Sequence, residues 1–151
     1  MVGLPCSGKT TYAKQLAENE NALLLTPDIW QLRLFGQDFP GKYHDERHTA
    51  IEHIMWDVAQ RVLSLGTSVI LDYGFWGKCE RDDFRQRAKD LNVGFRIHFM
   101  DIPKEELLAR LDERNKQDGI ESFHIPPVYL EEWYELFEPP TQEELQFNTP
   151  I

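Results

Sequence analysis

The sequence contains little cysteine, no long apolar run and no excess of positive charge. Its two cysteines, Cys6 and Cys79, supply no disulfide framework, which fits a reducing cytosol. It has no apolar run of about 18 residues and no charged-then-apolar leader, so we expect a cytoplasmic protein without a membrane partner. The formal net charge of -10 argues against duplex nucleic acid as a general partner, although a local basic pocket remains compatible with it.

The order of apolar runs and helical patterns predicts an α/β fold. At 151 residues the chain is large enough for one domain with a sizeable core, and we predict a single domain over residues 1–151. Strand-like runs cover residues 22–28, 67–74 and 94–101, and helical patterns cover residues 10–19, 28–36, 46–65, 77–92, 103–119 and 127–138. Helical crossovers between such strands imply a parallel sheet with helices on both faces, in three layers.

The segment GLPCSGKT, residues 3–10, has the complete G-x-x-x-x-G-K-T pattern of a P-loop. In such a loop the glycines permit a tight turn whose N–H groups face phosphate oxygens, Lys9 reaches the β- and γ-phosphates, and the Thr10 hydroxyl binds Mg²⁺. A helix follows directly, and its N-terminus favours anions. The predicted nucleotide-binding residues of this segment are Gly3, Pro5, Cys6, Ser7, Gly8, Lys9, Thr10 and Thr11.

Two details of this segment carry further expectations. Only Met1 and Val2 precede Gly3, whereas a P-loop follows a buried strand of about five residues. We therefore expect the numbered sequence to begin inside its first strand. Cys6 is interpreted as a small filler of the loop, although a thiol beside backbone donors can be acidified.

Carboxylates follow each predicted strand at the sheet edge where α/β proteins bind ligands: Asp28, Asp72 and Asp101. Asp72 comes after four apolar residues and so has the Walker B form, which holds Mg²⁺ in P-loop proteins. We predict that Thr10 and Asp72 bind the metal; the alternative for Asp72 is a turn former at a strand end.

Several aromatic and charged groups have two interpretations. Tyr73, Phe75 and Trp76 could stack on an acceptor or belong to the core. The tail aromatics from Tyr129 to Phe137 are interpreted as the seam that docks the last helix. His44, His48 and His53 lack the spacing of a zinc site and are expected at the surface or as satisfied histidines. The helix over residues 77–92, with Lys78, Arg81, Arg85, Arg87 and Lys89 among acidic residues, is expected to present a solvated face of mixed sign.

Together, the segments GLPCSGKTTYAKQLAE, LLLTPDIWQLRLFG, SVILDYGFWGKCERDDFRQRAKDLN and RIHFMDIPKEELLARLDERN resemble the P-loop kinase-like proteins of the polynucleotide kinase, zeta toxin and chloramphenicol phosphotransferase group. Within that group the chain is most similar to small bacterial AAA-family ATPase-like kinases. The resemblance covers residues 1–115, and the tail matches only the narrower set. It implies ATP and Mg²⁺ as cofactors.

The resemblance also implies roles for individual residues. Asp28, shortly after the second strand, corresponds to the general base that activates the acceptor hydroxyl; a helix N-cap is the alternative. Polynucleotide kinases of the group have an Arg three residues later that binds the acceptor phosphate, whereas this chain has Gln31, with Arg33 two residues further on. This departure places a nucleic-acid acceptor in doubt.

The region over residues 110–125 corresponds to the lid of the group, with Gly119 as a candidate hinge. Arg114 matches the lid arginine that stabilises the transferring phosphoryl group, and Arg110 is assigned to nucleotide binding. The alternative for both is an i,i+4 ion-pair helix, which accounts for Arg110.

The leading hypothesis is an ATP-dependent kinase of a small-molecule hydroxyl, with Lys9, Asp28 and Arg114 as catalytic residues. One alternative is a nucleotide-hydrolysing switch, although the letters NKQD at residues 115–118 do not follow a strand as a guanine motif requires. A further alternative is a kinase of nucleic-acid 5′-hydroxyl ends. The acceptor, the base preference and the oligomeric state cannot be inferred from the sequence.

Overall fold

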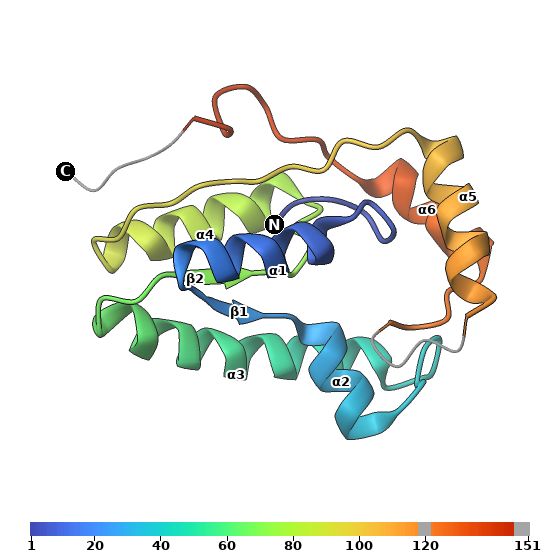
Figure 1. Ribbon diagram of the computed structural model, residues 1–151, viewed down its shortest axis with the longest axis horizontal. Coiled ribbons are helices and arrows are strands. Elements are labelled where there is room, and N and C mark those ends of the chain that lie inside the picture. Colours follow the sequence, from blue (N-terminus) through green and yellow to red (C-terminus); the bar gives the residue numbers. More distant parts are fainter. Residues whose placement is uncertain (118–121, 147–151) are drawn as a thin grey trace.

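The computed structural model describes residues 1–117 and 122–146 and follows the predicted alternation of elements (Figure 1). Its helices are α1 (Lys9–Glu20), α2 (Pro27–Phe35), α3 (His44–Ser64), α4 (Lys78–Asp90), α5 (Lys104–Asn115) and α6 (Pro127–Leu136), and its strands are β1 (Leu23–Leu25) and β2 (Val69–Leu71). None of the described helices is long and apolar enough to cross a membrane.

The sheet is parallel and short. β1 pairs with β2 in parallel, with Leu24 opposite Ile70. Beyond β2 lies Val2, which forms parallel bridges to Gly74 and to Phe99. The predicted strand over residues 94–101 was too long: this segment pairs through isolated bridges, because only the few residues that precede the P-loop lie beside it.

Helices cover both faces of this sheet, as predicted (Figure 1). Leu25 packs in a cluster with Ile51 and Met55 of α3, while Ile70 packs with Ala13 of α1 on the other face. Successive strand residues point to opposite faces, so the near-continuous apolar runs are explained by burial on both sides. The prediction of an α/β sheet between two helical layers is confirmed.

The apolar face of α3 is narrower than predicted. Ile51, Met55 and Ala59 are buried against the sheet, whereas Ile54 is 57% exposed and Val58 is 37% exposed. A helix that packs against one sheet buries a single stripe, and these two residues lie beside that stripe.

The prediction for α4 was wrong at Arg81. Lys78 pairs with Asp82 and Arg87 with Asp83, as expected of a solvated face of mixed sign. Arg81, however, is 1% exposed and its Nε atom lies 2.7 Å from Oε1 of Glu144, which is 2% exposed. The chain after α6 returns to α4 and buries this ion pair, which the sequence of α4 alone does not reveal.

A cavity of about 610 Å³ lies away from the P-loop. It is lined by the residues before and within β2, such as Ser68 and Val69, and by residues 95–98. None of the P-loop residues 3–10 lines this cavity, so it is not part of the site described below.

Candidate functional site

The predicted phosphate loop has the backbone that its sequence requires. Gly3 has φ 151°, and a Cβ atom there would lie 2.7 Å from Ser7 Oγ. Gly8 has φ 90° and is the N-cap of α1 in the left-handed conformation, where a side chain would be strained. These two glycines let the loop turn directly into a helix N-terminus, the arrangement that binds phosphate.

The predicted site residues come from four segments. Gly3, Pro5, Cys6, Ser7 and Gly8 form the loop; Lys9, Thr10 and Thr11 open α1; Asp28 lies in the first turn of α2; Asp72 directly follows β2; Arg110 and Arg114 lie on α5.

Thr10 and Asp72, the predicted metal pair, are in contact. The Thr10 hydroxyl donates to Asp72 Oδ2 at 2.6 Å, and the Thr26 hydroxyl at the end of β1 lies 3.5 Å from the same oxygen. Asp72 is 4% exposed. The ends of β1 and β2 and the first turn of α1 therefore converge on one buried carboxylate.

This pair has the chemistry to hold Mg²⁺. Asp72 Oδ1 is buried without a hydrogen-bond partner among the described residues, and a buried unpaired carboxylate oxygen is costly. The described residues contain no group of three or more His, Cys, Asp and Glu that could hold a metal. Mg²⁺ needs only one or two protein oxygens, because phosphate oxygens and water complete its shell.

Cationic side chains surround the loop. Arg110 Nη1 donates to the Cys6 carbonyl at 3.2 Å, while its Nη2 pairs with Glu106 at 2.5 Å. Arg114 donates to the Phe123 carbonyl at 3.3 Å, and its buried Nε has no partner among the described residues. The predicted i,i+4 ion pair therefore exists at Arg110, and the same side chain also contacts the P-loop.

The pKa of the Cys6 thiol is affected by the same cationic side chains. Burial raises the pKa of Cys6, and the nearby charges of Arg114, Lys9 and Arg110 oppose that rise without overcoming it. The pKa of this thiol is thus shifted upward, against the acidification that the sequence left open and in line with a small filler of the loop.

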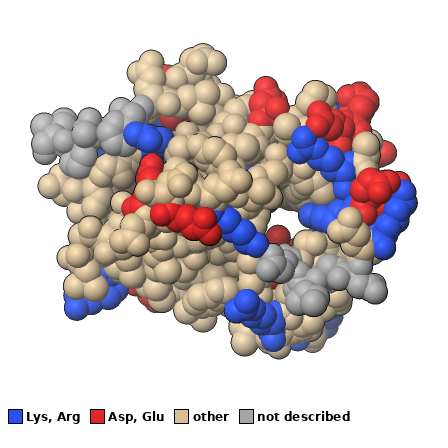
Figure 2. Space-filling model, viewed as in Figure 1, with Lys and Arg blue, Asp and Glu red and all other residues tan. Residues whose placement is uncertain are grey.

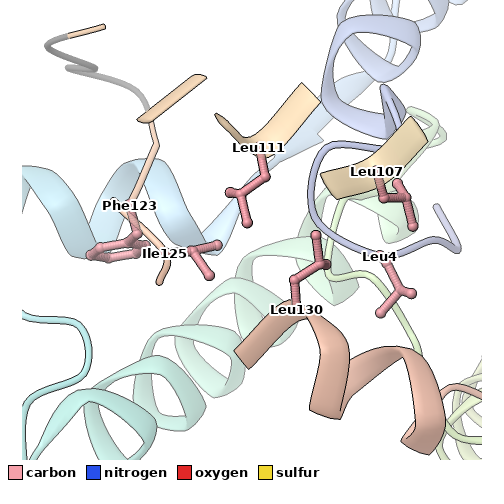
Figure 3. Packing of buried hydrophobic residues seen from close by; sticks show 6 residues of the cluster. All are labelled: Leu4, Leu107, Leu111, Phe123, Ile125 and Leu130. Atoms are coloured by element: carbon pink, nitrogen blue, oxygen red, sulfur yellow. The ribbon is translucent and has the colours of Figure 1, made fainter. Parts of the chain in front are cut away.

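A hydrophobic cluster fixes α5 against the loop. Leu4 of the P-loop packs with Leu107 and Leu111 of α5, and Leu130 of α6 completes this side of the cluster (Figure 3). Arg110 and Arg114 are carried on the helix that these contacts hold in place. Figure 2 shows an opening in the surface on the side of α5, bordered by Lys and Arg side chains.

Asp28 lies beside this site without capping its helix. The N-cap of α2 is Thr26, followed by Pro27 in the first turn. The Asp28 side chain is 49% exposed, with His48 Nδ1 3.8 Å from its Oδ1. The N-cap alternative was therefore wrong, and the carboxylate is accessible to a ligand.

A polar network next to Asp28 was missed by the sequence reasoning. Gln31 is fully buried, and its Nε2 donates to the Asp38 carboxylate at 3.1 and 3.2 Å and to the His44 carbonyl at 3.0 Å. Burial would raise the pKa of Asp38, but hydrogen bonds from His44, Gln31 and Arg47 outweigh burial and lower it. His44 and His48 are satisfied histidines, as expected; that one of them reaches Asp28 follows only from the packing of α2 on α3.

The aromatic residues after Asp72 are mostly core. Phe75 is 7% exposed and packs edge-on against Phe84 of α4, with ring centroids 4.9 Å apart. Trp76 packs against Trp133 of α6, with ring centroids 5.2 Å apart. Tyr129, Trp133 and Phe137 pack in the cluster that docks α6, as predicted, whereas Tyr134 is 37% exposed.

The predicted lid is described only at its ends, because Asp118 and Gly119 lie outside the described residues. Asn115 Nδ2 donates to the Ile125 carbonyl at 2.7 Å, and the Ile125 N–H donates to Asn115 Oδ1 at 3.3 Å. The first letter of the NKQD segment thus pairs with backbone rather than facing a nucleotide base.

Comparisons with known proteins agree with this geometry. A family model described as "AAA domain" matches residues 1–140. No curated protein matches the chain significantly. Nineteen chains of known structure do. One belongs to a structure described as "Structure of the Pnkp1/Rnl/Hen1 RNA repair complex"; it is 22% identical with a TM-score of 0.72, and the match covers 99% of this chain and 47% of that chain. The chain therefore spans about half the length of that relative, and the likeness shows a shared fold.

Proposed function

The chain belongs to the AAA-domain family of P-loop kinase-like proteins, and on that premise we propose that it transfers the γ-phosphoryl group of ATP to a hydroxyl of a small molecule. The observation that carries this proposal is the buried Asp72 carboxylate, which contacts the P-loop residue Thr10 and keeps one oxygen unpaired. Thr10 and Asp72 would hold a Mg²⁺ ion, and its charge would compensate that unpaired oxygen.

In this proposal each site residue has one task. The P-loop N–H groups and Lys9 bind the phosphates, and Thr10 and Asp72 hold Mg²⁺, which when bound neutralises charge on the β- and γ-phosphates. Arg110 supports the loop and the bound nucleotide, and Arg114 stabilises the charge of the transferring group.

Asp28 is the proposed general base. The acceptor oxygen bonds to the γ-phosphorus while the bond from that phosphorus to the β–γ bridging oxygen breaks, and ADP leaves. The hydroxyl proton passes to a carboxylate oxygen of Asp28. The exposure of Asp28 in the first turn of α2, two residues after the Thr26 that contacts Asp72, supports this role.

The surroundings of Asp28 favour an acceptor that has no phosphate group for residue 31 to bind. Gln31 is fully buried, so it offers no charge or free donor to a ligand. The net charge of -10 likewise does not favour a polyanion. A nucleic-acid end therefore stays an outcome of the test below.

The test is transfer of label from γ-labelled ATP, and separately GTP, to fractionated cytosolic metabolites and to 5′-hydroxyl oligonucleotides. We expect a labelled metabolite with wild type and with Asp57→Asn, a control for an exposed carboxylate on α3. Asp28→Asn should reduce transfer about 10²- to 10⁴-fold, the usual contribution of a general base. Lys9→Ala should abolish it.

Two results would redirect the proposal. Label found only as free phosphate, at a rate that Asp28→Asn does not change, would favour a hydrolysing switch. A labelled oligonucleotide, with binding weakened by salt, would identify a kinase of nucleic-acid ends.

A further inference from the structure

His48 lies on α3 with its ring between two carboxylates. Its Nδ1 atom is 3.8 Å from Asp28 Oδ1 on α2, and its Nε2 atom is 3.3 Å from Glu52 Oε1 one turn further along α3. The His48 side chain is 26% exposed, so protein groups supply most of its surroundings. His48 thereby links the proposed base to α3.

The orientation of the Gln31 amide is set by its partners. Gln31 Nε2 faces the Asp38 carboxylate and the His44 carbonyl, which only accept hydrogen bonds, and it also lies 3.0 Å from His44 Nδ1, which can accept or donate. The amide nitrogen must be at that end, so the Gln31 carbonyl oxygen is the atom turned toward His48.

Both ring nitrogens of His48 therefore face acceptors. Nδ1 is 2.9 Å from Gln31 Oε1, an amide oxygen that only accepts, and Nε2 faces the Glu52 carboxylate. A neutral imidazole carries one N–H and would leave one of these contacts without a proton. Only the doubly protonated ring satisfies both.

The charges around His48 favour the same state. Burial would lower the pKa of His48, but the hydrogen bond to Glu52 and the charges of Asp28, Glu52 and Asp45 outweigh burial and raise it above its ordinary value of 6.5. The other titratable ring in contact is His44, stacked with centroids 6.1 Å apart, and that ring is bonded to Asp38.

We propose that His48, as an imidazolium, is a positioning residue that holds the Asp28 carboxylate oriented for the acceptor hydroxyl. This inference rests on the proposed role of Asp28. A phosphoryl transfer with a loose transition state depends more on the position of the base than on its strength. The His48 ring is held in place by Gln31 and Glu52, so its positive charge lies at a fixed point beside Asp28 and orients that carboxylate.

The sign of the pH dependence follows. The imidazolium is present below the pKa of His48 and lost above it, so wild-type kcat should fall as pH rises through a value above 6.5. His48→Gln should lower kcat roughly tenfold to a hundredfold without changing the KM for ATP, and should lack this alkaline fall. His48→Lys keeps the cation and should retain most of the rate, with the fall displaced to higher pH, since a lysine titrates near about 10.4.

The closing experiment measures kcat against pH for transfer from γ-labelled ATP to the metabolite that the test above labels. It compares wild type, His48→Gln, His48→Lys, Asp28→Asn and the control His53→Gln, an exposed histidine on the same helix. In parallel, NMR titration of the His48 ring follows its pKa in wild type and in Asp28→Asn. We expect His53→Gln to behave as wild type, and Asp28→Asn to lower the His48 pKa because one carboxylate neighbour has been neutralised.

The outcomes separate the two proposals. If Asp28→Asn abolishes transfer while His48→Gln keeps wild-type kcat and the same alkaline fall, the inference about His48 is wrong and the base assignment stands. If Asp28→Asn leaves transfer intact, the base assignment fails. A His48 pKa at or below 6.5 in the wild-type protein overturns the inference, and this measurement does not depend on whether any variant folds or is active. A His48 pKa that Asp28→Asn leaves unchanged also overturns it.

Discussion

Asp72 combines burial, charge and an unpaired oxygen in one side chain. It is 4% exposed, and one of its oxygens accepts from Thr10 while the other has no partner among the described residues. Such a carboxylate is costly unless a cation or a donor joins it. Under the proposed function, a bound Mg²⁺ would be the partner of this oxygen.

At the residue scale we predict that Asp72→Asn separates nucleotide binding from transfer. The amide oxygen can still accept from Thr10, so the loop should keep its shape, but the charge that attracts Mg²⁺ is lost. We expect ATP binding without Mg²⁺ to stay within about threefold of wild type, while Mg²⁺-dependent transfer falls by about a hundredfold or more.

Calorimetric titration of ATP with and without Mg²⁺, together with the transfer assay, checks this prediction. Equal losses of binding in both titrations would show that Asp72 supports the loop rather than the metal. Asp83→Asn, an exposed carboxylate on α4, is the control for the loss of one negative charge.

At the scale of elements, the segment after α6 is held to α4 by charge. Arg81 donates to Glu144 at 2.7 Å and also to the carbonyls of Phe75 and Trp76 at 3.1 and 3.2 Å. Arg81 thus connects the C-terminal segment to the loop that follows Asp72. Removal of one partner from such a buried pair is costly, because it leaves the other charge buried without compensation.

We predict that this ion pair makes the stability of the protein fall in acid. Burial would raise the pKa of Glu144, but the hydrogen bonds and charge of Arg81 and the hydrogen bonds from Thr141 outweigh burial and lower it to about 2, from an ordinary value of 4.5. The stabilisation is present above pH 4.5 and is lost as the pH falls toward 2. A pKa difference of this size corresponds to about 3 kcal/mol.

Urea unfolding between pH 6 and pH 3 measures this effect. Glu144→Gln should destabilise the protein by about 3–5 kcal/mol at pH 6, because it leaves Arg81 buried without a counter-charge, and should flatten the acid dependence. Glu143→Gln changes an exposed neighbour and should stay within about 0.5 kcal/mol of wild type. A Glu144→Gln variant as stable as that control would contradict the prediction.

At the scale of the whole molecule, the clusters around the sheet and around α5 and α6 meet at residues 2–4, where the chain enters the P-loop. Leu4 belongs to the cluster of α5 and α6, while Val2, two residues earlier, packs with Phe75 and Ile97 beside the sheet. A ligand on the loop therefore contacts a segment that both clusters hold. This supports the proposal of a single domain over the chain.

We predict one cooperative unfolding transition that nucleotide shifts upward. Mg·ATP at a hundred times its Kd should stabilise the protein by about 2.7 kcal/mol, which for a domain of this size raises Tm by roughly 5–10 °C. Lys9→Ala should keep the Tm of the free protein and lose the shift. Scanning calorimetry checks both, and two transitions, of which only one responds to nucleotide, would contradict a single domain.

Much of the fold could be predicted because it is encoded locally. The α1 helix after the loop, the helix that ends before Gly36 and the helix introduced by Pro103 each follow from periodicity and from Gly or Pro at their ends. The extent of the strands could not be predicted as well. A strand exists only where a neighbour pairs with it, and the 94–101 segment has few partners.

The sequence by itself determined the phosphate loop, the α/β order and the family of this protein, because a P-loop is one continuous segment whose glycines, lysine and threonine act through local backbone geometry. The sequence also paired Thr10 with Asp72 through the Walker B pattern, and the structure places the two in contact. Tertiary structure alone decided that Arg110 contacts the carbonyl of Cys6, that Arg81 is buried by Glu144, and that His48 lies beside Asp28. These pairs are far apart along the chain, and no spacing in the sequence records a contact that forms only when separate helices pack on one sheet.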